Sequence, residues 1–62
     1  MIITIGKKYH VTDVDGNGTS ADVLVTDAAH NTSNGVTGFL CELIGSGDGR
    51  VVYPPDFDRE IR

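Results

Sequence analysis

Hydrophobic and polar residues alternate on both sides of a glycine-rich turn, Gly16-Asn17-Gly18, within residues 9–27. Alternation with a period of two predicts a half-buried β-hairpin. A two-residue Asn17-Gly18 loop would set Asp13 opposite Asp22, and facing like charges are destabilising. We therefore expect a three-residue loop, which gathers two apolar pairs on one face of the hairpin: Val11 with Val23, and Tyr9 with Val25.

The most apolar part of the chain predicts a second hairpin, in which residues 36–44 and 50–53 flank another glycine-rich turn. If Gly47-Asp48-Gly49 closes this hairpin, two pairs are opposite each other: Leu43 with Tyr53, and Ile44 with Val52. The first pair then shares a face with Phe39, Cys41 and Val51, and the second shares the other face with Leu40. Both faces are apolar, which is typical of a hairpin covered on both sides.

Three other segments complete the expected fold. Residues 2–5 are β-branched and predict a first strand, whereas residues 27–35 are polar and turn-rich and predict an exposed loop. Pro54-Pro55 ends the second hairpin because proline lacks a donor for the strand ladder. Beyond it, Phe57 and Ile61 are four residues apart, which favours one helical turn, with a short final strand as the alternative.

Together these elements predict an all-β fold with about five short strands. We expect a small, partly open barrel of the SH3-like or OB-like kind, built from two hairpins and ending in a short C-terminal helical turn. Residues 1–62 are expected to form one domain. A barrel of this kind does not imply a function by itself.

Charge and hydropathy narrow the class of protein. The chain has nine acidic and five basic side chains and a formal net charge of −4. Because the basic residues are scattered, the sequence argues against direct nucleic-acid binding; the residues to examine for such a role are Lys7, Lys8 and Tyr9. No stretch approaches the ~20 apolar residues of a membrane span, and the first residues do not resemble a secretion signal. We therefore expect a cytoplasmic protein with no membrane partner.

The small size of the chain favours association with a partner. A domain of 62 residues buries only about 60% of the surface of its unfolded chain, so a single core is marginal. One cysteine cannot form an internal disulfide. Self-association or a bound protein is therefore the expected source of additional stability.

An outer stripe of apolar residues is the main candidate for a binding surface. In the expected registers, Leu24, Leu40, Ile44 and Val52 are outside the main core, with Ile2 as a further candidate. Contiguous exposed apolar surface usually marks an interaction site. The alternative is that the polar loop or the C-terminal turn covers this stripe.

The first turn also resembles a known metal-binding loop. Asp13-Val14-Asp15-Gly16-Asn17-Gly18 is similar to the opening of an EF-hand or dockerin calcium loop, in which oxygen ligands occupy positions one, three and five. The resemblance implies a weak calcium or magnesium site at Asp13, Asp15 and Asn17. Leu24 occupies the position of the family's bidentate carboxylate, so the resemblance ends before that ligand. The alternative is a polar hairpin tip with no ligand.

No residue pattern indicates catalysis or a bound cofactor. Cys41 is in an apolar strand without an adjacent base, and neither His10 nor His30 has metal-ligand spacing to it. We therefore expect a non-enzymatic protein-interaction module that binds another protein or forms a homodimer. Its size and acidity suit a small accessory or inhibitor protein, such as those encoded by bacteriophages and mobile elements. The alternative function is divalent-metal binding.

Overall fold

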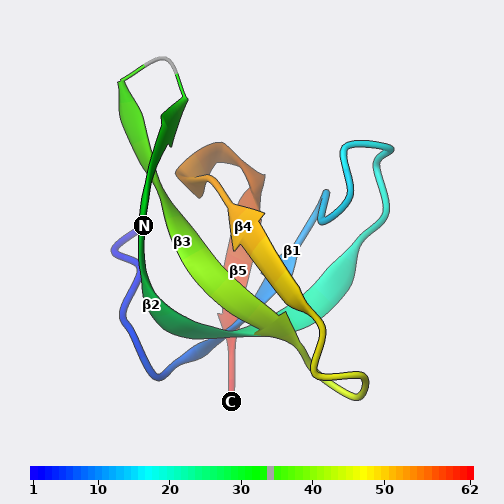
Figure 1. Cartoon of the computed structure of the whole chain (residues 1–62). Helices are drawn as coiled ribbons and strands as arrows, with labels where there is room; N and C mark the ends of the chain where they lie inside the picture. Colours follow the sequence, from blue (N-terminus) through cyan, green and yellow to red (C-terminus); the bar gives the residue numbers. More distant parts are fainter. Residues whose placement is uncertain (34) are drawn as a thin grey trace.

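Five antiparallel strands form one sheet in the order β4-β3-β2-β1-β5 (Figure 1). The computed structural model describes residues 1–33 and 35–62, and for residues 30–33 the backbone alone. The strands are β1 (Lys8–Val11), β2 (Ala21–Ser33), β3 (Val36–Leu43), β4 (Gly49–Val52) and β5 (Phe57–Ile61), with a 3-10 helix, η1 (Pro54–Asp56), before β5. The all-β prediction is confirmed, and the described strands do not close into a complete barrel. The described residues contain no helix with the length and apolar character that a membrane crossing needs.

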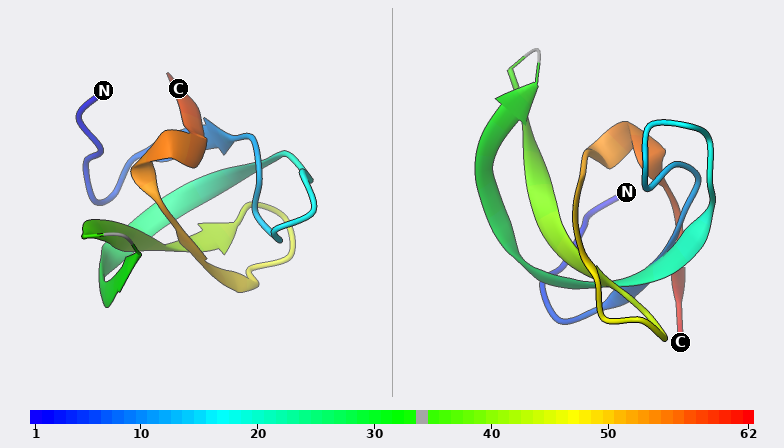
Figure 2. Two further views of the ribbon diagram at one scale, coloured as in Figure 1. Left: turned by 90° about the horizontal axis from the view of Figure 1, so that it is seen from above. Right: turned by 45° about the vertical axis from the view of Figure 1, so that its right-hand side comes forward.

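A small core lies inside the curve of the sheet. Strand β2 is the longest strand, and it bends so that its first part pairs with β1 and the rest follows β3 (Figure 2). The side chains that point into the curve are buried: Tyr9, Val11, Val14, Val23, Val25, Cys41, Val52 and Phe57. Tyr9 and Phe57 contact each other edge to face, with ring centroids 5.3 Å apart. Most of the core therefore consists of valines, packed around the two aromatic rings.

The first hairpin has the expected faces but a different register. Tyr9 pairs with Val23, and Val11 pairs with Ala21, so the predicted Tyr9–Val25 and Val11–Val23 pairs are wrong by two residues. A shift of two keeps every side chain on its face, because the strand period is two. The connection is longer than the predicted three residues, and Val14 within it folds back onto the core.

The second hairpin has a register in which one strand, β4, is turned over relative to the prediction. Val52 pairs with Phe39 rather than with Ile44, a displacement of five residues. An odd displacement turns β4 over relative to β3, so Val52 points into the core and Val51 points outward. The predicted Leu43–Tyr53 and Ile44–Val52 pairs are wrong because the connection is longer, with Leu43 N–H donating to the Asp48 carbonyl (2.8 Å).

Residues 2–5 do not form the predicted first strand. Thr4 N–H donates a hydrogen bond to the hydroxyl of Tyr9 (2.7 Å), and Gly6 N–H donates to the Val25 carbonyl (2.8 Å). Gly6 has φ of 91°, a left-handed conformation that glycine adopts without a Cβ clash. The segment therefore turns at Gly6 and crosses one end of the core, where Ile3 packs against it.

Most of the predicted loop at residues 27–35 is part of the sheet. Strand β2 continues to Ser33, with Asp27 opposite Leu40 and Thr32 opposite Thr37. Register irregularities interrupt this part of the β2–β3 ladder, so turn-prone residues are accommodated within paired strands. Of the predicted turn, Gly35 is a turn residue and Asn34 lies outside the described residues.

The C-terminal segment forms a strand, which was the alternative to the expected helical turn. Residues Phe57–Ile61 pair with β1 as strand β5, and the only helical turn near this end in the described chain is η1, which starts at Pro54. Phe57 is buried against Tyr9. A seven-residue tail gains more hydrogen bonds by adding to the sheet than by forming an isolated helical turn.

Candidate functional site

The outer face of the sheet exposes apolar side chains around the middle of β2 and β3. Leu40, Ile44 and Val51 expose 42%, 48% and 38% of their surface, and Leu24 is half-buried among them. Leu40 pairs with Val51 across β3 and β4, whereas Ile44 follows β3 and its N–H donates to the Asp22 carbonyl (3.0 Å). We call these four residues the outer apolar surface.

Val52 does not belong to the predicted outer stripe. It is 1% exposed and lies in the core, because β4 is turned over relative to the expected register. Val51 takes the outward position instead. Ile2 is 88% exposed but belongs to the N-terminal segment rather than to the sheet. The structure therefore places Leu24, Leu40 and Ile44 on one face, as expected, and replaces Val52 by its neighbour.

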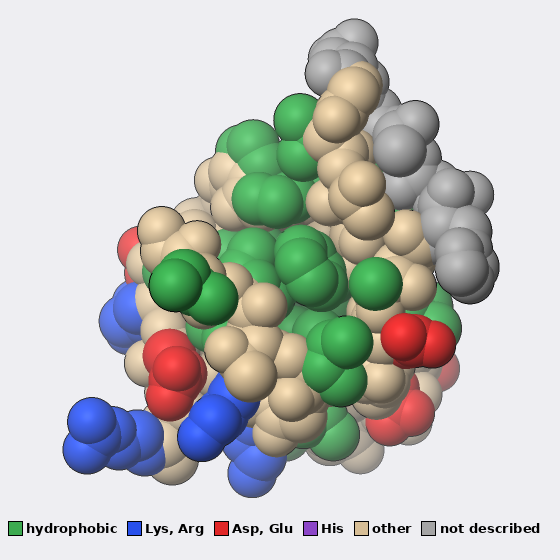
Figure 3. All heavy atoms as spheres, turned by 90° about the vertical axis from the view of Figure 1, so that its left-hand side faces the viewer, with side chains coloured by type: hydrophobic (Ala, Val, Ile, Leu, Met, Phe, Trp, Pro, Cys, Tyr) green, Lys and Arg blue, Asp and Glu red, His purple; other side chains and the backbone are tan. Residues whose placement is uncertain are grey.

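Apolar side chains also gather on a second face. Figure 3 shows the left-hand side of Figure 1, where hydrophobic side chains occupy the middle of the face and Lys and Arg lie at its lower left. In the N-terminal segment, Met1 and Ile5 are exposed together with Ile2. The segment is held by hydrogen bonds from Thr4 to Tyr9 and from Gly6 to β2 rather than by strand pairing.

Opposite charges flank Leu24 on the outer face. Leu24 pairs with Lys8 of β1 on one side and with Glu42 of β3 on the other, and both charged side chains are exposed. One pair further along, His10 Nδ1 lies 2.8 Å from Asp22 Oδ1. His10 is partly exposed and is the direct partner of Asp22 in the β1–β2 ladder. His30 is in β2, and its side chain lies outside the described residues.

The two carboxylates among the candidate metal ligands at the first hairpin tip, Asp13 and Asp15, accept hydrogen bonds within the turn. Asp13 Oδ1 accepts from the amides of Gly16 (2.7 Å) and Gly18 (3.1 Å). Asp15 Oδ2 accepts a hydrogen bond from the Thr19 hydroxyl (2.6 Å), and Asp15 Oδ1 accepts one from the backbone N–H of Asn17 (2.8 Å). These bonds lower the pKa of the Asp15 carboxyl, with the Thr19 hydroxyl as the largest cause. The carboxylates therefore have a structural role in the turn, and metal binding by Asp13, Asp15 and Asn17 stays a prediction.

Cys41 is a buried core residue. Its side chain is fully buried, and its thiol donates to the carbonyl oxygen of Phe39 (3.5 Å). Burial raises the pKa of the thiol to about 11, because the thiolate would lose its hydration. A thiol with this pKa is a weak nucleophile at neutral pH.

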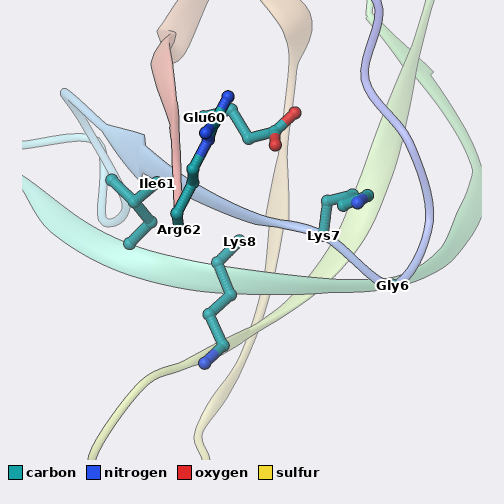
Figure 4. Close-up of a pocket in the computed structure, with 6 residues that line it drawn as sticks. All are labelled: Gly6, Lys7, Lys8, Glu60, Ile61 and Arg62. Carbon is teal, nitrogen blue, oxygen red and sulfur yellow. The ribbon is translucent and has the colours of Figure 1, made fainter.

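A shallow groove of about 420 Å³ lies where β1 begins and β5 ends, which sequence reasoning did not identify. Its lining residues are Gly6, Lys7, Lys8, Glu60, Ile61 and Arg62 (Figure 4). Lys7, Lys8 and Arg62 line it together because β5 pairs with β1, although their charged ends point in different directions (Figure 4). Tyr9, named with Lys7 and Lys8 as a nucleic-acid candidate, is fully buried and cannot stack on a base.

No protein-family model, curated protein or solved structure matches this chain. The class of protein is therefore defined by its fold: a small all-β protein with one five-stranded antiparallel sheet.

Proposed function

We propose that this chain is a non-enzymatic protein-interaction module that binds a protein partner through the outer apolar surface. The observation that supports the proposal is the exposure of Leu40 and Val51 on the sheet and of Ile44 directly after β3. Hydration of apolar side chains is unfavourable, so covering these positions with another surface is favourable. A small accessory or inhibitor protein of the cytoplasm, encoded by a phage or a mobile element, is the kind of protein that we infer.

The edges of the sheet are less suited to binding than its face. Strand β5 is an edge strand with consecutive exposed charges at Asp58, Arg59 and Glu60. The other edge strand, β4, has only four residues and is followed by prolines. Charged or very short edges discourage the addition of another strand. The face of the sheet is therefore the better candidate for the binding site.

The curvature of the sheet supports a further proposal about the fold class. A single antiparallel sheet that bends around a small core, with a 3-10 helix between its last two strands, has the general plan of a partly open SH3-like or OB-like barrel. Such folds serve many unrelated functions, so this proposal does not change the inferred function.

The binding proposal is tested with a double variant on the outer face, Leu40→Ser with Ile44→Ser. Val36→Ser is the matched control, because Val36 is 37% exposed at the start of β3, away from Leu24. Proteins cross-linked to each form in an extract of the source cells, including second copies of the chain, are compared. We expect the wild-type protein and the control to retain the same associations and the double variant to lose them. Associations that persist in the folded double variant would remove support for the proposal.

The alternative function, a weak calcium or magnesium site at the hairpin tip, has less support. Asp13 Oδ1 and both carboxylate oxygens of Asp15 already accept hydrogen bonds from their own chain. A ligand that binds only the native state raises its stability. A higher melting temperature in millimolar calcium than in EDTA, lost in Asp13→Ala, would favour the alternative.

A further inference from the structure

The partner of the outer apolar surface can be inferred from one row of residues across the sheet. The row runs from β1 to β3 through directly paired positions, Lys8, Leu24 and Glu42. Leu24 is on the central strand, and the two exposed charges are one strand away from it on opposite sides. Adjacent strands are about 4.8 Å apart, so a cation and an anion are placed symmetrically about an apolar centre.

Symmetry makes this row complementary to itself. Consider two copies packed with their outer faces together and related by a two-fold axis that runs parallel to β2 between the faces. This axis reverses the left-to-right order of the strands in the second copy. Leu24 then meets Leu24 of the second copy, and Lys8 of each copy faces Glu42 of the other. An interface between identical chains must be self-complementary in this way. A two-fold axis perpendicular to β2 would instead set Lys8 against Lys8.

We propose that the protein forms a two-fold symmetric homodimer through its outer face, with β2 along the axis and two reciprocal Lys8–Glu42 ion pairs around Leu24. This inference rests on the proposed function and names its partner as a second copy of the chain.

The apolar residues around the row fit the same arrangement. Ile44 is diagonal to Leu24, because the Asp22–Ile44 hydrogen bond is one outward position along β2 from the Leu24–Glu42 pair. Asp22 also approaches the axis, and its carboxylate is turned toward His10 of its own chain, 2.8 Å away. The apolar part of the contact is therefore Leu24 with Ile44, and the hydrogen bond to His10 draws each Asp22 carboxylate off the axis toward β1.

The size of the face determines how strong the dimer is. The molecule measures 29 × 25 × 20 Å, so even its largest face is no larger than the area of about 800 Å² that each partner contributes to a standard interface. The sheet is curved, and two convex faces touch mainly along their centre (Figure 2). Contact therefore concentrates on Leu24 and on the long side chains beside it. We expect a weak dimer whose formation depends on protein concentration and decreases with added salt.

The test is charge reversal combined with mixing, followed by sedimentation velocity from micromolar to millimolar concentration. Lys8→Glu places two pairs of like charges in the homodimer, and Glu42→Lys does the same. Each variant alone should therefore self-associate about tenfold more weakly than the wild-type protein. An equimolar mixture of the two variants restores both opposite-charge pairs, and the mixture should therefore dimerise about as strongly as the wild-type protein. Lys7→Glu, which makes the same charge change outside the row, is the control and should dimerise nearly as the wild-type protein does.

Two results would overturn this inference. If the wild-type protein is monomeric at millimolar concentration, the partner is not a second copy. If it dimerises but the mixed variants do not recover the association, the two-fold arrangement along β2 is wrong. Neither result decides the proposed function. Binding of a different protein is measured separately, by the loss of cross-linked partners in the Leu40→Ser, Ile44→Ser variant.

Discussion

The hydroxyl of Tyr9 lies 2.7 Å from the amide nitrogen of Thr4 and accepts its hydrogen bond. The same hydroxyl is 3.4 Å from the Ile2 carbonyl, to which it donates. The ring of Tyr9 is fully buried in the core, so this polar tip is the link between the core and the N-terminal segment.

Tyr9→Phe removes this link while keeping the ring. Because the Thr4 amide loses its partner, we expect a loss of about 1 kcal/mol in the free energy of unfolding and faster hydrogen exchange at Thr4. Urea unfolding and amide exchange measure these two effects. The control is Tyr53→Phe, since the Tyr53 hydroxyl makes no hydrogen bond with the described residues. Equal stability of the two variants would show that the link contributes nothing.

Gly38 is a close-packed position on β3, beside β4. A Cβ added there would lie 2.9 Å from Cγ1 of Val51 and 3.0 Å from the ring of Tyr53. Gly38→Ala should therefore destabilise the fold by about 1–3 kcal/mol through overpacking. Gly49→Ala is the matched control, because a Cβ there has nothing within 4 Å. Thermal melting of both variants checks the difference, and a Gly38→Ala protein as stable as the control would contradict the β3–β4 packing.

The first hairpin tip should lose order at low pH. Hydrogen bonds from the Thr19 hydroxyl and the Asn17 amide lower the pKa of Asp15 below its usual value of 3.8. A lowered pKa in the folded state contributes stability that is present above the unfolded value and is lost as the pH falls through the folded value. Thr19→Val removes the largest cause and should raise the pKa of Asp15 in an NMR titration. An unchanged pKa in this variant would show that the Thr19 hydroxyl does not stabilise the carboxylate.

Cys41 should reduce stability at high pH. Burial raises the pKa of its thiol from 9.0 to about 11, so the folded state favours the neutral thiol. The resulting stability is complete below pH 9 and is lost as the pH rises through about 11. Cys41→Ala removes this titration, although it also leaves a small cavity. We expect the stability of the wild-type protein to fall more steeply than that of the variant across this interval, and parallel curves would contradict the burial of the thiol.

Side-chain faces could be predicted where they depend on local alternation. Tyr9, Val11, Val23 and Val25 share the buried face as expected, even though the register is displaced by two residues. The lengths of the connections could not be predicted, because they depend on contacts such as Val14 with the core. In the first hairpin the longer connection shifts the register by an even number of residues, so every side chain keeps its predicted face. In the second hairpin the register shift is odd, and Val52 therefore points into the core.

Pairing between segments that are far apart in the sequence could not be predicted from local patterns either. The strand β5 gains its hydrogen bonds from β1, at the other end of the chain, so the spacing of Phe57 and Ile61 favoured a helical turn that does not form. The groove between Lys7 and Arg62 depends on the same pairing. Of the candidate site, Leu24, Leu40 and Ile44 could be placed from the sequence, whereas Val51 and the symmetric Lys8–Leu24–Glu42 row required the observed registers.

The most direct measurement of the central claim, that the outer face joins two copies of the chain, is a methyl and amide NMR spectrum recorded from micromolar to millimolar concentration. The account predicts concentration-dependent shifts at Leu24, Leu40, Ile44 and Val51, with the buried methyl groups of Val11 and Val23 unchanged. Spectra in which these four residues stay constant up to millimolar concentration would contradict it.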